Sequence, residues 1–384
     1  MSESDVTRDG VHGARPGRDA LVGRGMGDGD RPGGGRGGRT GGGGRTGGDG
    51  RTGGDGRTGG DGRTGGDGRT GGDGRTGDRP MVPRAEFTSY YGRPVLNPPT
   101  WRPRDIAGYF FLGGLAGAGS VLAAGAELTG RPAMARALKV SSLAALTGST
   151  AALVHDLGRP ERFAHMLRVF KPTSPMSVGS WLLAAYGPVA GAAAASDLTG
   201  RLPRTGRAAT VAAALLGPAV ASYTAVLAAD TAVPAWHDGY RELPFLFVGS
   251  AAAAAGGMAL LASPVAENAP ARGVALLGTA VETAAVGAMK RRLGVVAETY
   301  REGRAGRLMR TAEALSAAGA LGGALLGRRS RTAAALGGAA LLAASACTRF
   351  GVFHAGMRSA EDPKYTVLPQ RERLAARQER SRDG

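Results

Sequence analysis

The sequence predicts an all-α integral membrane protein of about eight transmembrane helices, preceded by a disordered tail rich in Gly and Arg. Three observations support this fold class. Apolar runs of membrane length recur from residue 105 onward, short basic loops separate them, and the first 80 residues contain almost nothing that could form a core. The net charge of +17 therefore averages two unlike parts of the chain and does not indicate a soluble basic protein.

The first part, residues 1–80, repeats the sequence RTGGDG with a period of six, and copies open at Arg45, Arg51, Arg57, Arg63 and Arg69. Arg and Asp nearly cancel in charge, and Gly has the most backbone entropy to lose, so we expect disorder. RNA binding by such a tail would need aromatic side chains that stack on bases, and none precedes Phe87. We therefore expect no nucleic-acid partner. Residues 81–104 would form an amphipathic lead-in segment.

The membrane domain is expected to span residues 105–355, with a basic C-terminal tail at 356–384. Its eight apolar runs are Ile106–Leu128, Leu138–Leu157, Ser177–Leu198, Ala208–Ala229, Leu243–Ala262, Gly273–Met289, Thr311–Gly327 and Thr332–Phe350. Each is long enough for a helix rising ~1.5 Å per residue to cross a ~30 Å hydrocarbon core. A soluble bundle would show a charged stripe along each helix, which these runs lack. Stretches such as GGLAGAGS favour close helix–helix approach through small residues.

An even number of crossings places both ends of the domain on one side of the membrane. Loops on that side hold more Arg and Lys than the opposite loops, so the termini are expected in the cytoplasm. His155, Asp156, His165, His237 and His354 all fall on this side as well. A site is therefore expected at this face, where the second, fourth and eighth helices end and the first begins.

Two side chains inside the apolar runs need a partner. Glu282 lies near the middle of the sixth run, where a carboxylate costs ~2.5–3.5 kcal/mol on insertion scales; it is either hydrogen-bonded to a neighbouring helix or part of a proton relay. Tyr223 lies in the fourth run, and its hydroxyl either belongs to the interfacial aromatic belt or binds a quinone carbonyl. The single cysteine, Cys347, excludes a Cys-ligated iron–sulfur cluster within this chain.

Several motifs occur together in a fixed order. They are YYGRPVLNPPTW (Tyr90–Trp101), AGYFFLGGLAGAGS (Ala107–Ser120), LGRPERFAHMLRVFKPTSPMSVGSW (Leu157–Trp181) and SYTAVLAADTAVPAW (Ser222–Trp236). In order and spacing they resemble the NrfD/polysulfide reductase membrane subunit family. The resemblance covers about Tyr90 to Phe350.

This resemblance implies two four-helix bundles that exchange electrons between a quinone, either menaquinone or ubiquinone, and an iron–sulfur subunit connected to a molybdopterin catalytic subunit. It implies no haem or iron–sulfur cluster in this chain. The quinone-contacting tyrosine of the family falls on Tyr223, and the family's first-helix histidine falls on Tyr109, a departure in which a phenol replaces an imidazole. A proton-transferring acid falls on Asp156. In the polysulfide reductase branch this pocket faces outside the cell, whereas the charge count here places it inside.

We therefore expect Tyr223, with Tyr109 or His155, to hold a quinone oxygen, and Asp156, with Glu282 as a deeper relay, to move protons. Arg162, Arg168 and Lys171 would form a basic docking surface for the iron–sulfur subunit. Ser174 or Ser177 would cap the third membrane helix. The chain would be a non-catalytic or quinone-reacting subunit of an oxidoreductase complex. The alternative is a secondary transporter or channel that uses Glu282 in a polar membrane pathway.

Overall fold

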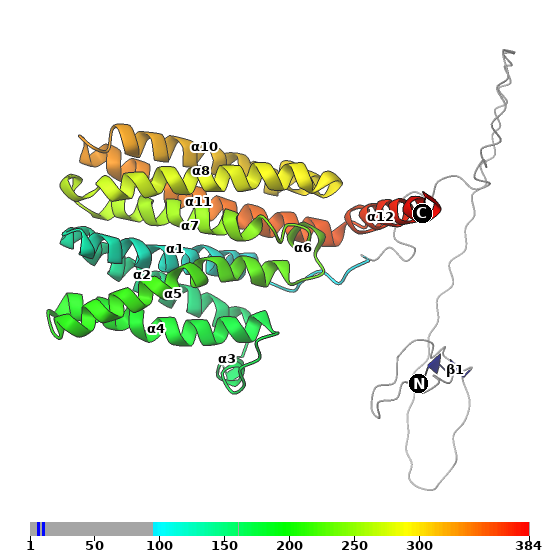
Figure 1. Ribbon diagram of the computed structural model, residues 1–384, viewed down its shortest axis with the longest axis horizontal. Coiled ribbons are helices and arrows are strands. Elements are labelled where there is room, and N and C mark those ends of the chain that lie inside the picture. The colour runs from blue at the N-terminus through cyan, green and yellow to red at the C-terminus, as the bar shows by residue number, and fades with distance from the viewer. Residues whose placement is uncertain (1–5, 8–9, 12–94, 160, 384) are drawn as a thin grey trace, which may run out of the picture. The chain divides into compact units, whose positions relative to one another are not determined.

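The computed structural model describes residues 6–7, 10–11, 95–159 and 161–383 (Figure 1). The chain divides into two units, Met1–Asp78 and Arg79–Gly384. In the first unit, β1 (Val6–Thr7) and β2 (Gly10–Val11) form a short antiparallel pair. The RTGGDG repeats and most of the expected lead-in segment lie outside the described residues.

The second unit is helical, with a long helix at each of the eight predicted places. These helices are α1 (Pro103–Leu128), α2 (Pro132–Asp156), α4 (Pro175–Thr199), α5 (Pro203–Ala229), α7 (Leu243–Ala262), α8 (Ala269–Arg292), α10 (Gly303–Leu325) and α11 (Arg331–Glu361). Short elements connect them: α3 (Glu161–Met166), α6 (Pro234–His237), η1 (Val265–Glu267), η2 (Gly294–Ala297) and α9 (Glu298–Arg301), with α12 (Lys364–Asp383) after α11.

Proline sets where several of these helices begin. Pro103, Pro132, Pro175 and Pro203 each lie at the start of a long helix, where the missing N–H would have no partner and the fixed φ already suits a helix. The helices consequently begin two to six residues before the apolar runs do. At the other end of α4, Gly200 adopts φ +66°, a left-handed conformation that ends the helix and turns the chain into α5.

Six helices are long and apolar enough to cross a membrane: α1, α2, α4, α5, α7 and α11. Helices α8 and α10 do not meet that description, although eight spans were predicted. The physical reason is charge. In α8, Arg272 directly precedes the apolar run and Glu282 interrupts it, and α10 carries Arg304, Arg307, Arg310 and Glu313 in its first half.

By their contacts the long helices fall into two groups: α1, α2, α4 and α5 are hereafter the first set, and α7, α8, α10 and α11 are the second set (Figure 1). In the first set, α1 and α4 each pack against both α2 and α5. In the second set, α7 and α10 each pack against both α8 and α11. Helices α1 and α5 then contact α7, and α1 also contacts α11.

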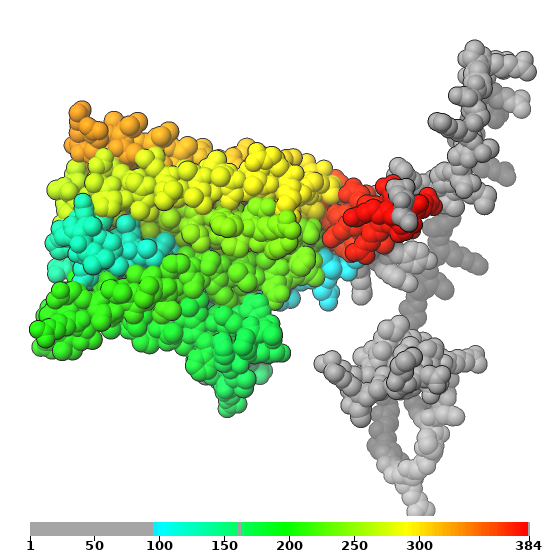
Figure 2. Space-filling model, in the orientation of Figure 1, coloured from blue at the N-terminus to red at the C-terminus, as the bar shows by residue number. Residues whose placement is uncertain are grey.

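Because consecutive long helices are antiparallel, α3, α6 and α9 lie at one end, hereafter the α6 end. The loops around Gly130, Gly200, Asn268 and Gly327 lie at the other, hereafter the Lys139 end. Figure 2 shows α3 and its flanking loop projecting from the helices at the α6 end.

Small residues allow α1 and α5 to approach closely, as the sequence predicted. A Cβ placed on Gly117 would lie 2.4 Å from the carbonyl oxygen of Gly217, and a Cβ on Gly217 would lie 2.4 Å from that of Gly117. Any side chain at either position would push the two backbones apart. Gly125, eight residues further along α1, has open space at its Cβ position.

Replacing Gly117 by Ala is expected to destabilise the helix assembly by about 1–3 kcal/mol, because the added methyl group meets backbone that cannot move aside. The measurement is Tm in detergent for the full chain, with Gly125→Ala as the matched control. Gly125→Ala should leave Tm unchanged or raise it slightly, since Ala favours helix more than Gly. Equal Tm values for the two variants would contradict the close α1–α5 contact.

Candidate functional site

The start of α1 and the end of α2 are joined by two polar contacts at the α6 end. The Asp105 carboxylate lies 2.8 Å from His155 Nδ1, and the backbone N–H of Arg102 donates to Asp156 Oδ1 at 3.0 Å. The imidazole of His155 is 64% exposed. The structure thus brings two of the predicted site residues, His155 and Asp156, onto one rim.

A cluster of aromatic rings fixes the same rim from the other side. Trp101 stacks on Trp236 of α6 with ring centroids 5.4 Å apart, and the indole N–H of Trp236 donates to the carbonyl oxygen of Val352 in α11. The Tyr300 hydroxyl donates to the carbonyl oxygen of Ala235 at 2.9 Å. Helix α6 is therefore held rigidly between the segment preceding α1, helix α11 and helix α9.

Tyr109 and Tyr223 lie one to two turns inside this rim. Tyr109 in α1 is 2% exposed, and Tyr223 in α5 is half-buried. The two side chains are close enough to interact electrostatically. Neither hydroxyl is hydrogen-bonded within the part of the chain that the structure describes. Two phenols from different helices therefore lie in the same region, and each hydroxyl is without a partner among the residues that the structure describes.

Glycine shapes the wall beside Tyr223. A Cβ on Gly179 of α4 would lie 1.9 Å from Cζ of the Tyr223 ring and 2.1 Å from its hydroxyl oxygen. The ring therefore rests directly on the α4 backbone at this point. Only glycine leaves room for it there.

Beneath Tyr109, small polar groups replace apolar ones. The Ser149 hydroxyl donates to the carbonyl oxygen of Tyr109 at 3.2 Å, and a Cβ on Gly113 would lie 3.3 Å from that Ser149 oxygen. The hydroxyl of Thr224, which follows Tyr223, is buried and has no partner among the described residues. The floor of the region between α1, α2 and α5 is therefore polar.

The loop between α3 and α4 holds part of the predicted basic surface. Arg168 and Lys171 are exposed, whereas the side chain of Arg162 lies outside what the structure describes. Ser174 caps α4 by accepting from the Ser177 N–H, and the Ser177 hydroxyl in turn donates to the carbonyl oxygen of Val169 and accepts from the Lys171 N–H. Hydrogen bonds of both serines thus fix this loop to the first turn of α4.

Two ion pairs tie further elements together at the α6 end. Arg292 Nε donates to Glu242 Oε1 at 2.6 Å, which holds the pKa of Glu242 below its usual value. Lys364 Nζ donates to Glu298 Oε2 at 2.6 Å, and this hydrogen bond lowers the pKa of Glu298 and raises that of Lys364. The pairs connect α8 with the start of α7, and α12 with α9.

Glu282 does not belong to the tyrosine region. It is 6% exposed within the α7, α8, α10 and α11 set, where Thr348 donates to Oε1 at 2.6 Å and Ser316 donates to Oε2 at 3.4 Å. The buried carboxylate thus receives bonds from two neighbouring helices, α10 and α11. This is the hydrogen-bonded arrangement that the sequence analysis considered beside the proton relay.

Arg349 is a buried charge that the sequence analysis missed. It is fully buried in α11, its Nη2 donates to the carbonyl oxygen of Phe247 at 2.6 Å, and its guanidinium lies 3.8 Å above the Phe247 ring. It also interacts electrostatically with Glu282. The apolar run was expected to end at Phe350, which made Arg349 a helix-end residue, but α11 continues to Glu361. The apolar stretch Phe350–Phe353, directly after Arg349, could have indicated that the helix continues beyond this arginine.

The fold and this arrangement define a multi-pass membrane protein whose ionisable and phenolic groups gather mainly at one end of its helices. Residues 100–275, which are 176 of the 384 residues, match the model of the polysulphide reductase NrfD family. The family comprises membrane subunits of molybdopterin oxidoreductase complexes, and the matched range contains Tyr109, Asp156, Gly179 and Tyr223. No curated protein matches the chain.

Replacing Arg349 by Ala is expected to destabilise the protein by about 3–5 kcal/mol, because Phe247 and Glu282 lose a buried partner and a cavity opens. Arg331→Ala is the matched control: that side chain also donates to carbonyl groups but is exposed at the start of the same helix. Tm in detergent measures both. Combining Arg349→Met with Glu282→Gln should recover part of the loss, since it removes both buried charges together. A Tm for Arg349→Ala equal to that of the control would show that the contact contributes nothing.

Proposed function

We propose that this chain is the quinone-interacting, electron-transferring membrane subunit of a molybdopterin/iron–sulfur oxidoreductase complex. In this proposal all eight long helices cross the membrane as two four-helix bundles. The charges of α8 and α10 are then accommodated by protein contacts and by their positions near helix ends. The α6 end faces the cytoplasm, as the distribution of Arg and Lys among the loops favours.

The observation that carries the proposal is the pair of phenols, Tyr109 and Tyr223, inside the α6 end, whose hydroxyls bond to none of the described residues. A neutral hydroxyl can donate to a quinone carbonyl or accept from a quinol hydroxyl without burying a net charge. The backbone of Gly179 supports the Tyr223 ring, and the Tyr109 side chain is buried in α1. His155, largely exposed at the rim, would complete the binding of the ring.

Protons and electrons would leave this site by different groups. Asp156 is half-buried at the end of α2 and can exchange protons with water at the α6 end. Electrons would pass to a cluster in a separate iron–sulfur subunit docked on the basic surface of Arg162, in α3, and of Arg168 and Lys171, in the loop that follows. Glu282 lies in the other helix set, so here it holds α8 against α10 and α11 rather than carrying protons.

The direct test is the composition of the purified complex. The full chain, isolated in mild detergent with its bound subunits, is expected to contain iron, molybdenum and an isoprenoid quinone. Metal analysis and organic extraction measure these. Isolation of the folded chain from its native host with none of the three would contradict the proposal.

Removing one hydroxyl tests the site itself. Tyr223→Phe should lower quinol oxidation by the assembled complex at least tenfold, which is about 1.4 kcal/mol of lost stabilisation, while Tm stays unchanged because the hydroxyl bonds to no described residue. Steady-state rates with menadiol measure the effect. Unchanged rates would remove Tyr223 from the site.

Displacing the ring without changing it gives an independent test. Gly179→Ala places a methyl group where the Tyr223 ring lies, so the ring must move and quinol oxidation should fall. Gly191→Ala, on the same helix and with open space at its Cβ position, is the matched control and should retain full activity. Equal activity in both variants would show that the position of the ring does not matter.

A further inference from the structure

Helix α12 is packed against the other helices at its first turns and is exposed beyond them. Lys364 is ion-paired with Glu298, and the next two side chains, Tyr365 and Thr366, are buried. From residue 370 to residue 382, every side chain except that of Ala376 is exposed. Figure 1 shows α12 extending beyond the ends of the long helices at the α6 end. The greater part of this helix therefore packs against little of its own chain.

A helical segment of this kind is marginal by itself. Isolated helices shorter than about 12–15 residues are barely stable in water, and packing of an apolar face supplies most helix stability in proteins. Leu374 is the only large apolar side chain between residues 370 and 382. The segment thus has no apolar face that could insert into a bilayer. We therefore expect a polar partner that stabilises it.

A cleft of about 400 Å³, hereafter the α12 cleft, runs along one face of this segment. On the α12 side it is lined by residues of one helix face: Pro369, Glu372, Arg373, Ala376 and Arg380. The opposite wall includes Asp238, Arg292 at the end of α8, and Val295 and Val296 of η2. The distance from Pro369 to Arg380 along the helix is about 16 Å at ~1.5 Å per residue. The cleft is therefore long enough for about five residues of extended chain at ~3.3 Å each.

The two walls differ in how their charges are bonded. Arg292 donates to both carboxylate oxygens of Glu242 and to the carbonyl oxygen of Asp238, so this wall is fixed and its cation is neutralised. On α12, Arg373 and Arg380 each donate one N–H, from Nε, to a carbonyl oxygen of their own helix, at 3.0 and 3.1 Å. Their Nη groups have no partner among the described residues. Each guanidinium thus presents four N–H donors, a geometry that suits a carboxylate.

The charge of the segment indicates the kind of partner. Residues 370–382 contain five Arg and two Glu, so the segment is basic. Glu372 and Asp238 line the cleft beside the arginines, and the exposed Arg377 lies one turn beyond Arg373. Basic groups therefore exceed acidic ones at this surface, and a partner segment rich in carboxylates complements it.

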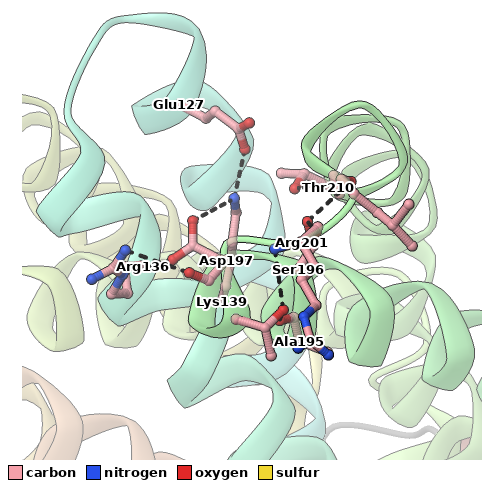
Figure 3. A network of polar contacts seen from close by, with 11 residues as sticks. Glu127, Arg136, Lys139, Ala195, Ser196, Asp197, Arg201 and Thr210 are labelled. Carbon is pink, nitrogen blue, oxygen red and sulfur yellow. Dashed lines mark hydrogen bonds and ion pairs between the residues drawn. The ribbon is translucent and has the colours of Figure 1, made fainter.

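The polar cluster at the Lys139 end is bonded differently (Figure 3). Lys139 Nζ forms ion pairs with Glu127 Oε2 at 2.7 Å and with Asp197 Oδ1 at 3.3 Å, and Arg136 Nε pairs with Asp197 Oδ2 at 2.9 Å. Carboxylates of the same chain thus satisfy these cations. In the α12 cleft, no carboxylate of the described residues is paired with Arg373 or Arg380, which leaves that position for another chain.

We propose that an acidic segment of the iron–sulfur subunit binds in the α12 cleft, with its carboxylates on Arg373 and Arg380. The proposal rests on the proposed function, which supplies this subunit. Residues 364–383 lie outside the range that matches the family, so the match does not assign this contact. Arg168 and Lys171 precede α4 of the first set, whereas α12 follows α11 of the second set. Two contacts, one on each helix set, fix the orientation of the bound subunit and thereby the distance from its cluster to the tyrosines.

Charge reversal in the α12 cleft tests this contact. The complex is purified through a tag on the full chain that carries Arg373→Glu and Arg380→Glu, and bound iron per chain is measured after washing at about 0.15 M salt. The double variant should retain about fivefold less iron than the wild type, because reversed charges repel a carboxylate-rich segment. Tm of the full chain should not change, since both side chains bond only within α12.

Two matched controls separate the cleft from charge in general. Arg201→Glu combined with Arg204→Glu reverses two exposed arginines at the Lys139 end whose side chains bond to no described residue. Arg382→Glu reverses one arginine on the opposite face of α12, for comparison with Arg380→Glu alone. Both controls should keep the iron content of the wild type.

Protection from trypsin gives a measurement that needs no variant. Trypsin cleaves after Arg, so cuts at Arg373, Arg377 and Arg380 should be about tenfold slower in the wild-type complex than in the full chain produced alone, because cleavage follows the exposed population. Mass spectrometry locates the cuts. The chain alone in nanodiscs of phosphatidylglycerol tests the other occupant, an anionic membrane surface.

The opposing results are distinct. Unchanged iron in the Arg373 and Arg380 double variant, an equal loss in the controls, or equally fast cleavage of α12 with and without the partner overturns the contact and leaves the proposed function standing. Protection by phosphatidylglycerol alone that equals protection in the complex assigns the cleft to the membrane and also overturns the contact. A wild-type complex that contains no iron overturns the proposed function itself.

Discussion

The packing of α1 is the constraint on which the rest of the structure depends. It contacts α2, α5, α7 and α11, and 72% of its most apolar stretch is buried, compared with 33% in α2 and α4. Lipid offers no hydrophobic drive for helix association, so this central position depends on close backbone contact, which Gly117 and Gly217 permit. The same helix carries Tyr109 at one end and Glu127 at the other, and its placement therefore fixes both polar regions.

Polar side chains divide into two kinds in this helix assembly. One kind is bonded completely and stabilises packing: Thr348 and Ser316 on Glu282, or the indole of Trp236 on Val352. The other kind is buried or half-buried with an open bonding position: the hydroxyls of Ser142 and Thr224, and the phenols of Tyr109 and Tyr223. Unpaired polar groups are costly in a low-dielectric interior. Such groups occur among the described residues of both helix sets, since Thr279 of α8 and Arg349 and His354 of α11 also hold buried atoms without a partner. The two phenols lie in α1 and α5, within the range that matches the family, and this is the basis for placing the chemistry there.

Much of the fold was readable because membrane helices are specified by local sequence. The predicted run Leu243–Ala262 coincides with α7, and the prolines that begin α1, α2, α4 and α5 explain the residues by which those helices extend beyond the apolar runs. The number of membrane spans was harder to predict from the sequence. Helices α8 and α10 carry charges, and their Ala and Gly residues are not apolar enough to compensate for them. The end of α11 was misplaced for a related reason: Arg349 resembles a helix-end charge until its neighbours Phe247 and Glu282 are known.

The sequence by itself determined the helical class, the order of the helices and the end of the helices at which His155, Asp156 and Tyr223 lie. The length of each apolar run can be read locally, and each successive helix reverses the direction of the chain, so counting the runs gives the end at which a residue lies. Only the tertiary structure decided which groups meet. It buried Lys139 between Glu127 and Asp197, laid Tyr223 on Gly179, and placed Glu282 in the set of helices away from the tyrosines. Those outcomes depend on how helices that are distant in sequence are rotated and spaced relative to one another. Contacts between small residues set this rotation and spacing, and no single helix encodes it.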